Sequence, residues 1–146
     1  MATRIGLVAC SAGKLTEPAR ARDLYTSPLF RKASAYAAQT CDAWFILSAK
    51  HGLLRPDAIL APYDQKLGDL PALKREDWAR QVRAQLARDL RPYRHDQITL
   101  VALAGKDYRA ALDGVLWPVE VPMRGLGIGQ QLGFLTRELA ALDGAK

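Results

Sequence analysis

Ile5-Gly6-Leu7-Val8-Ala9-Cys10-Ser11-Ala12-Gly13-Lys14 is the stretch that decides the fold. Its apolar first half is typical of a parallel strand covered on both faces, where neither side of the strand meets water. The run stops at a thiol, a hydroxyl, a glycine and a lysine, so the strand is predicted to open into a polar loop. In open α/β sheets, ligands bind beyond the carboxyl ends of the strands. We therefore expect the functional site of this protein at that edge.

The rest of the chain alternates strand patterns with helix patterns. Apolar runs predict three further strands, at residues 43–48, 97–104 and 117–121. The last is expected at an edge of the sheet, because Pro118 lies inside it and cannot donate a ladder hydrogen bond. Apolar residues at helical spacing predict four helices, at residues 28–39, 73–90, 106–112 and 130–142. Ser27 and Pro28 are expected to be the N-cap and first residue of the first of these helices.

This alternation predicts one α/β domain over residues 1–146. We expect a three-layer, Rossmann-like sandwich, with a mostly parallel sheet of about four strands and helices on both faces. The connection from Ala49 to about Leu70 is longer than an ordinary loop, and loops of such length often carry function.

The composition bounds location and partners. No apolar run reaches the roughly 18 residues of a membrane span, and no signal-peptide core follows Met1. The two cysteines, Cys10 and Cys41, are expected to be free thiols in a reducing, cytoplasmic compartment. A net charge of +6 favours phosphate-bearing partners, although an arginine-rich solvated surface explains it equally well. The sequence does not indicate an oligomeric state.

Parallel strands would bring four polar, glycine-bearing segments to one edge of the sheet. These segments are residues 10–14, 48–52, 105–108 and 124–130. The catalytic candidates in them are His51, Cys10 and Lys50. His51 would transfer protons, because an imidazole titrates near neutral pH. Cys10 would be a nucleophile favoured by nearby cations, and its alternative is a small buried hydrophobe. The alternative for His51 is a cap on local backbone groups.

The remaining candidates would hold a phosphate or a base. They are Ser11, Gly13, Lys14, Tyr25, Tyr63, Arg124, Gly127 and Gly129. The first three form a compact turn suited to an anion, but it lacks the first glycine of a Walker loop and Leu15 follows the lysine. The glycines that precede the last helix could bind an anion through free amides, or could serve only a tight strand-to-helix turn. Two histidines and scattered aspartates do not predict a transition-metal site. We expect no cofactor.

Four motifs together resemble a small prokaryotic and phage family of unknown function. They are Cys10-Ser11-Ala12-x-Lys14-Leu15, the segment from Ala21 to Phe30, Leu47-Ser48-Ala49-Lys50-His51-Gly52-Leu53, and Gly127-x-Gly129-Gln130-Gln131-Leu132. More distantly, the Cys-Ser-x-x-Lys turn after a first strand is similar to a domain of archaeosine synthase, which modifies 7-deazaguanine in tRNA. The peroxide-stress YaaA family and uracil-DNA-glycosylase-like folds are weaker similarities. The resemblance implies a connection with nucleobases or nucleic acids, and no particular reaction.

We therefore expect an enzyme that acts on a nucleobase, nucleotide or nucleic acid, of a base-modifying or glycosylase- or lyase-like kind. The alternative is a non-catalytic module that binds a nucleotide or nucleic acid, in which the basic face formed by Arg80, Arg83 and Arg91 would matter more than His51. A third possibility, an interaction subunit, would need a large exposed apolar patch.

Overall fold

The structure is a computed structural model that describes residues 2–144. A mixed, mostly parallel sheet of five strands forms its centre, in the order β4-β3-β1-β6-β7. These strands are β1 (Thr3–Ala9), β3 (Ala43–Ser48), β4 (Gly52–Leu54), β6 (Ile98–Leu103) and β7 (Val119–Glu120). β4 runs antiparallel to β3, and the other neighbouring pairs are parallel. A separate antiparallel pair joins β2 (Ala19–Arg20) to β5 (Ile59–Leu60).

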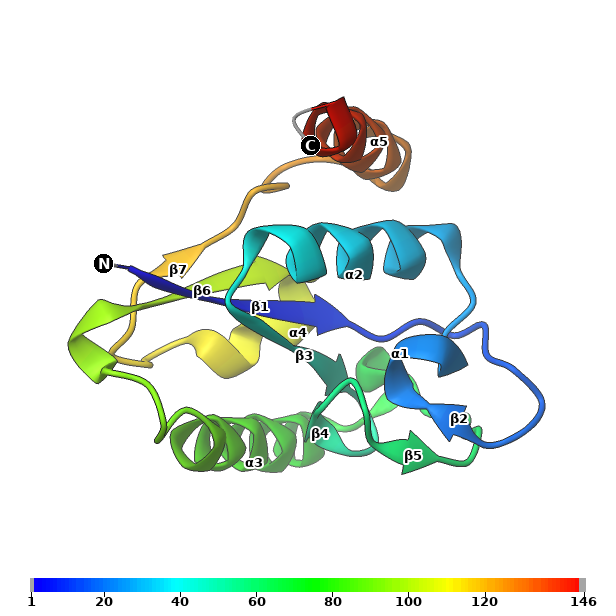
Figure 1. Cartoon of the computed structure of the whole chain (residues 1–146). Helices are drawn as coiled ribbons and strands as arrows, with labels where there is room; N and C mark the ends of the chain where they lie inside the picture. The colour runs from blue at the N-terminus through cyan, green and yellow to red at the C-terminus, as the bar shows by residue number, and fades with distance from the viewer. Residues whose placement is uncertain (1, 145–146) are drawn as a thin grey trace.

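Helices flank both faces of the five-stranded sheet (Figure 1). The α-helices are α1 (Ala21–Leu24), α2 (Pro28–Thr40), α3 (Ala72–Asp89), α4 (Lys106–Arg109) and α5 (Ile128–Gly144). Three short 3₁₀ turns complete the chain: η1 (Leu67–Asp69), η2 (His95–Gln97) and η3 (Ala110–Leu112). α2 and α5 lie above the sheet in Figure 1, and α3 and α4 lie below it. None of the helices in residues 2–144 has the length and apolar character needed to cross a bilayer.

The alternation of side chains along β1 divides the core between the two layers of helices. Ile5 and Leu7 point toward α3 and are fully buried, whereas Val8 points toward α2 and α5 and is also buried. β1 pairs with strands on both sides, and Leu7 lies opposite Phe45 on β3 and Ala102 on β6. Each fully buried aliphatic side chain contributes about 1.5–3 kcal/mol through the hydrophobic effect. The apolar run of β1 therefore stabilises both layers at once.

The start of α2 confirms the predicted cap. Ser27 Oγ accepts a hydrogen bond from the Phe30 amide at 3.1 Å, and Pro28 occupies the first turn, where its missing N–H costs nothing.

The sheet differs from the prediction in having five strands rather than about four. β4 was missed because it has only three residues and follows β3 through a tight hairpin, inside the stretch predicted to be a long loop. That stretch also contains β5 and η1, so it is more regular than predicted. Segments of two to four residues are too short to show a strand or helix period in the sequence.

The order of the parallel strands places a crevice at one point of the sheet. From β1 the chain passes to β3 on one side and later to β6 on the other. Such a reversal creates a topological switch point, and open α/β folds bind ligands beyond the carboxyl ends of the two strands that flank it. Here those strands are β1 and β6, which end at Ala9 and Leu103.

Gly6 permits the close approach of α2 to the sheet. A Cβ atom built at Gly6 would lie 3.0 Å from Ala37 Cβ, 3.2 Å from Cys41 Sγ and 3.2 Å from Trp44 Cβ. Ala37 is fully buried at this contact, and Cys41 and Trp44 are half-buried, so an added methyl group would have little room.

Replacing Gly6 with alanine should therefore lower the free energy of unfolding by about 1–3 kcal/mol, because the extra methyl group overpacks the contact between β1 and α2. Chemical denaturation measures the effect. Gly129→Ala is the matched control: a Cβ atom there meets nothing within 4 Å, so the free energy should stay within about 0.5 kcal/mol of wild type or rise. Equal stability of the two variants would contradict this account of the packing.

Candidate functional site

Tyr63 is the centre of a polar cluster beyond the carboxyl ends of β1 and β3. Its hydroxyl lies 2.6 Å from Ser48 Oγ and 2.5 Å from the hydroxyl of Tyr25. Tyr25 and Ser48 are almost completely buried, and Tyr63 is half-buried. Three hydroxyl groups from three separate segments of the chain therefore form one continuous hydrogen-bonded chain.

Ser48 sets the direction of that chain. Its Oγ already accepts hydrogen bonds from the backbone amides of Lys50 at 3.3 Å and His51 at 3.1 Å. These two bonds occupy both lone pairs of the oxygen. Ser48 must therefore donate its proton to Tyr63, and Tyr63 in turn donates to Tyr25.

Positive charge and an imidazole surround the Tyr63 ring. Lys14 Nζ lies 4.5 Å from the ring centroid and Lys50 Nζ lies 5.8 Å from it, within the range of cation–π attraction. The imidazole of His51 meets the same ring edge-on, with 5.2 Å between the centroids. Tyr25 joins the group through an isolated bridge with Lys14. The structure thus brings together five of the residues singled out from the sequence.

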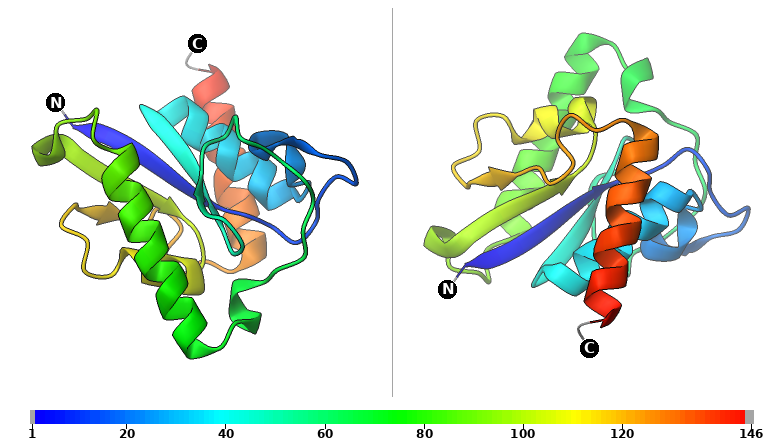
Figure 2. Two further views of the ribbon diagram at one scale, coloured as in Figure 1. Left: turned by 90° about the horizontal axis from the view of Figure 1, so that it is seen from below. Right: turned by 90° about the horizontal axis from the view of Figure 1, so that it is seen from above.

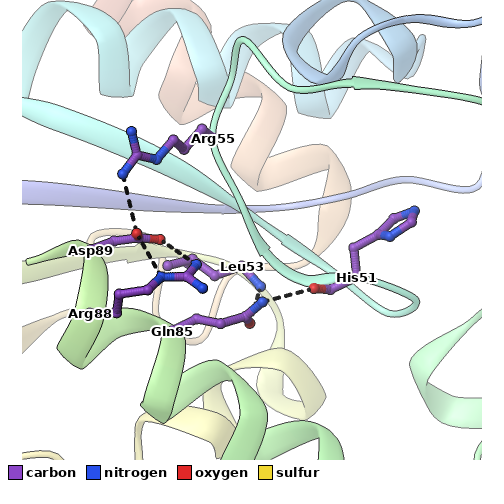
Figure 3. A network of polar contacts seen from close by, with 6 residues as sticks. All are labelled: His51, Leu53, Arg55, Gln85, Arg88 and Asp89. Atoms are coloured by element: carbon purple, nitrogen blue, oxygen red, sulfur yellow. Dashed lines mark hydrogen bonds and ion pairs between the residues drawn. The ribbon is translucent and has the colours of Figure 1, made fainter.

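A clamp from α3 holds the backbone at His51. The side-chain oxygen of Gln85 accepts a hydrogen bond from the Leu53 amide at 2.8 Å, and its side-chain nitrogen donates one to the His51 carbonyl at 3.2 Å. The side chain of Gln81 donates a second hydrogen bond to the same carbonyl at 3.2 Å. In Figure 3 the carbonyl of His51 points to Gln85, and its imidazole points the other way. Gly52 makes the turn possible, because its φ of +76° favours glycine and a Cβ atom would lie 2.3 Å from Gln85 Oε1.

A buried carboxylate, paired with two exposed arginines, lies next to the clamp at the end of the hairpin. Asp89 on α3 receives hydrogen bonds from Arg55 at 3.3 Å and from Arg88 at 3.2 Å (Figure 3). Burial alone would raise the pKa of Asp89, but the hydrogen bonds from the two guanidinium groups outweigh it and hold the pKa below its usual value. The carboxylate therefore stays charged and ties β4 to α3.

The environment of His51 keeps its imidazole neutral at neutral pH. Partial burial lowers the pKa of His51, and the positive charge of Lys50 lowers it further. A neutral imidazole accepts a proton, so His51 is suited to act as a base rather than as an acid.

Cys10 follows β1 directly and lies close to a second tyrosine. Its Sγ is 3.4 Å from the hydroxyl of Tyr108 on α4, and its amide donates to the Leu47 carbonyl at 2.9 Å. The ring of Tyr108 packs edge-on against Trp78, whose indole N–H donates to the Ser48 carbonyl at 2.8 Å. Ser48 is therefore held from both faces of the sheet, and Cys10 belongs to the same local network.

The turn after Cys10 uses its polar groups on its own backbone. Ser11 Oγ donates to the Gly13 carbonyl at 3.3 Å, and Lys14 Nζ donates to the Ala12 carbonyl at 3.1 Å. The Gly13 carbonyl also accepts the Thr26 amide, and a Cβ atom at Gly13 would lie 2.9 Å from Thr26 Oγ1. The turn holds Lys14 in place beside the tyrosines.

The glycine-rich turn before α5 follows β7, at the opposite end of the strand order from the β3–β4 hairpin that carries His51. The Gly127 amide donates to Gln130 Oε1 at 3.0 Å, and Gly129 lies in the first turn of α5. Arg124 is exposed and lines a hollow of about 330 Å³ with Lys106 and Arg109. Three of the sequence-predicted phosphate ligands therefore belong to a different part of the carboxyl edge.

A small cavity lies at the switch point, beyond the ends of β1 and β6. It measures about 80 Å³ and is lined by Cys10 and Ser11 after β1, Gly105 after β6, and Gln131 on α5. At roughly 30 Å³ for each water molecule, this cavity is the size of two or three waters and too small for a nucleotide. Within residues 2–144, no three or more His, Cys, Asp or Glu side chains gather as a metal site requires.

The sequence profile of a family of unknown function, DUF6884, matches residues 5–137. The chain belongs to this family. The chain is also similar to the uncharacterized protein YfjM of Bacillus subtilis (strain 168), which is 32% identical over 150 residues, covering 92% of this chain and 93% of the relative. No solved structure matches the chain significantly. The expectation of a family of unknown function is thus confirmed, and the whole Tyr63 cluster lies inside the DUF6884 region.

Sequence reasoning missed Ser48, Tyr108 and Trp78 as members of this cluster in the DUF6884 region. Ser48 and Tyr108 stand in the strand-end segments predicted to converge, so their positions were a usable signal. The sequence contains no signal for Trp78, because it lies on the apolar stripe of α3, as a tryptophan of the core would in any case.

Removing the middle hydroxyl of the chain should destabilise the fold. Tyr63→Phe leaves the buried Ser48 and Tyr25 hydroxyls without their partner, which should lower the free energy of unfolding by about 1–3 kcal/mol. Tyr93→Phe is the control, because the Tyr93 hydroxyl makes no side-chain hydrogen bond within the described residues; it should change the free energy by less than about 0.5 kcal/mol. Denaturant titration compares the two variants, and equal effects would show that the hydroxyl chain contributes no stability.

Alkaline pH should destabilise the protein through Tyr25. Burial raises the pKa of Tyr25 from 10.0 to about 12, and the pKa values of Tyr63 and Tyr108 also rise, chiefly through burial. The unfolded chain therefore loses these protons first, and stability falls as pH rises from 10 to 12. Denaturant midpoints measured across this range should decline less steeply in Tyr25→Phe than in wild type. Parallel declines would contradict the raised pKa.

Proposed function

We propose that this protein is an enzyme acting on a nucleobase, nucleotide or nucleic acid, with its centre at the Tyr63 cluster. The observation that carries the proposal is the meeting of Lys14, Lys50 and a neutral His51 around one tyrosine ring, beside the Cys10 thiol. The two ammonium groups would hold a phosphate, and Tyr25 or Tyr63 would lie near the base.

His51 would be the proton acceptor of the reaction. Its imidazole is neutral at neutral pH, and the Gln85 clamp fixes the backbone segment from which the imidazole projects. Cys10 would be either the nucleophile or part of the wall of the site. In the thiolate form it would accept a hydrogen bond from Tyr108, whose raised pKa keeps the phenol protonated. The reaction class would be base-modifying, or glycosylase- or lyase-like.

The fold and the cysteines support two finer parts of the proposal. Helices on both faces of the sheet and the β3-β1-β6-β7 order of its parallel strands favour a three-layer, Rossmann-like assignment. Cys10 and Cys41 are free thiols, which favours a reducing, cytoplasmic location.

One observation favours the second candidate, a non-catalytic module that binds nucleic acid. A groove of about 550 Å³ lies along α3 and carries arginines, and His51 is not part of it. A binding module would depend on that groove and would tolerate the loss of His51, so a variant of His51 separates the two candidates.

Replacing His51 with alanine should lower turnover about 10²–10⁴-fold and leave ligand affinity within a few-fold, because the base is lost but the cations remain. The assay incubates the protein with nucleosides, nucleoside monophosphates and single-stranded oligonucleotides and follows products by mass spectrometry. Calorimetry with nucleoside monophosphates measures affinity, which Lys14→Gln should weaken about tenfold.

The pH dependence of turnover should also identify His51 as the base. Wild-type activity should persist at neutral pH and fall only in acid, as His51 becomes protonated with a pKa below 6.5. His95→Ala is the matched control, since His95 is the other histidine and lies exposed against Trp117. If both histidine variants keep full turnover and the same pH profile, His51 is not the base and the binding-module candidate takes over.

A further inference from the structure

The second feature that could serve a substrate is the groove between α3, η1 and α4. In Figure 2, left, α3 crosses the lower face of the molecule with the η1 turn at one end and the α4 segment beside it. The groove measures about 550 Å³, within the roughly 300–1,000 Å³ typical of sites that bind ligands. Its floor is apolar and includes Leu67 and Trp78, which are buried.

The walls of the groove carry more positive than negative charge. Arg75, Arg80 and Arg83 line it from α3, and Lys106 lines it from the start of α4. Within residues 2–144, neither Arg75 nor Lys106 forms an ion pair. Arg80 pairs with Asp77 at the surface, where such a pair contributes little. The groove thus has free cationic groups on two opposite sides.

The spacing of the arginines suits a chain of phosphates. Arg75 and Arg83 are eight positions apart on one helix, which corresponds to about 12 Å at 1.5 Å per residue. A stacked nucleic-acid strand carries one phosphate about every 3.4 Å along its axis, so about three to four phosphates span this wall. Guanidinium groups also match the geometry of phosphate better than any other side chain.

Two carboxylates in the groove favour nucleic acid over an acidic peptide. Glu76 and Asp107 lie among the cations. They repel the negative charges of either partner, but the amino groups of bases can donate hydrogen bonds to them, and acidic side chains cannot. The groove is concave and closed on two sides by α3 and α4, which suits one strand. A duplex is read instead by a helix or ribbon that projects from the protein.

The groove and the Tyr63 cluster lie on either side of one residue. Tyr108 packs against Trp78 in the floor of the groove, and its hydroxyl lies 3.4 Å from Cys10. The rings of Trp78 and Tyr108 therefore lie between a nucleic-acid strand in the groove and the Cys10 thiol.

We propose that this groove binds the flanking phosphates of a single-stranded nucleic acid, one nucleotide of which is presented to the Tyr63 cluster. The inference rests on the proposed function and narrows its substrate class from any nucleotide to a single strand. Free nucleotides would fill only the cluster and would leave the groove empty.

The test is binding of a short fluorescent single-stranded oligonucleotide of mixed sequence, as DNA and as RNA, followed by anisotropy over a range of salt. Four phosphate contacts predict a slope of log affinity on log salt of about −3, at about −0.7 for each contact. The variant Arg75→Gln/Arg80→Gln should bind about tenfold more weakly and reduce the slope by about 1.4.

The matched control is Arg91→Gln/Arg94→Gln. The sequence grouped Arg91 with Arg80 and Arg83, but in the structure Arg91 follows the end of α3 and does not line the groove. Arg94 does not line it either, both arginines are exposed, and Arg94 pairs with Asp96 as Arg80 pairs with Asp77. This double variant removes the same charge as the groove variant. Because its arginines lie outside the groove, its affinity should stay within about twofold of wild type and the salt slope of its binding should not change. Equal losses in the two double variants would show general attraction to a basic surface and would overturn the groove proposal.

The other outcomes separate this inference from the proposed function. If polyglutamate of equal charge displaces the oligonucleotide as well as unlabelled strand does, the groove is a site for acidic peptides and the inference fails. If wild type binds no oligonucleotide but binds a nucleoside monophosphate in a Lys14-dependent way, the inference fails and the proposed function stands. If neither ligand binds, both fail.

Discussion

The parallel pairing of β1 with β3 on one side and β6 on the other is the constraint on which the rest of the structure depends. Because both neighbours run in the same direction as β1, all three strands end at one edge. Residues that are far apart in the chain, such as Cys10, Ser48 and Gly105, are placed there by backbone hydrogen bonds rather than by any attraction between their side chains. The apolar side chains of β1 then fix the edge in space, since they are buried under helices on both faces.

Ser48 connects this scaffold to the chemistry of the edge. It is the last residue of β3, its carbonyl is bound from one face by Trp78, and its hydroxyl is bound from the other face by Tyr63. Polar groups buried this deeply are costly unless they are hydrogen-bonded, and here three segments of the chain, at residues 50–51, 63 and 78, supply the partners. The result is a rigid row of hydroxyls whose orientation is decided before any ligand binds.

The polar residues at the carboxyl edge of the sheet form two separate groups. Lys14 and His51 surround Tyr63 on the side of β3, whereas Arg124 and the glycine-rich turn lie on the side of β7, with a small cavity at the switch point between them. Membership of DUF6884 carries no reaction with it, and a fold alone does not specify one. The argument for function therefore rests on the side chains at the Tyr63 cluster and along α3.

The sequence by itself determined the alternation of strands and helices, the cap at Ser27 and the set of polar segments at the strand ends. These are properties of neighbouring residues: apolar runs, helical spacing and capping chemistry act over a few positions. Only the tertiary structure decided that β4 adds a fifth strand, that Trp78 and Tyr108 join the site, and that Arg124 lines a hollow with Lys106 and Arg109. Those outcomes depend on strand order and on which helix covers which face, and both are set by the packing of segments distant in the chain, which leaves no local pattern to detect.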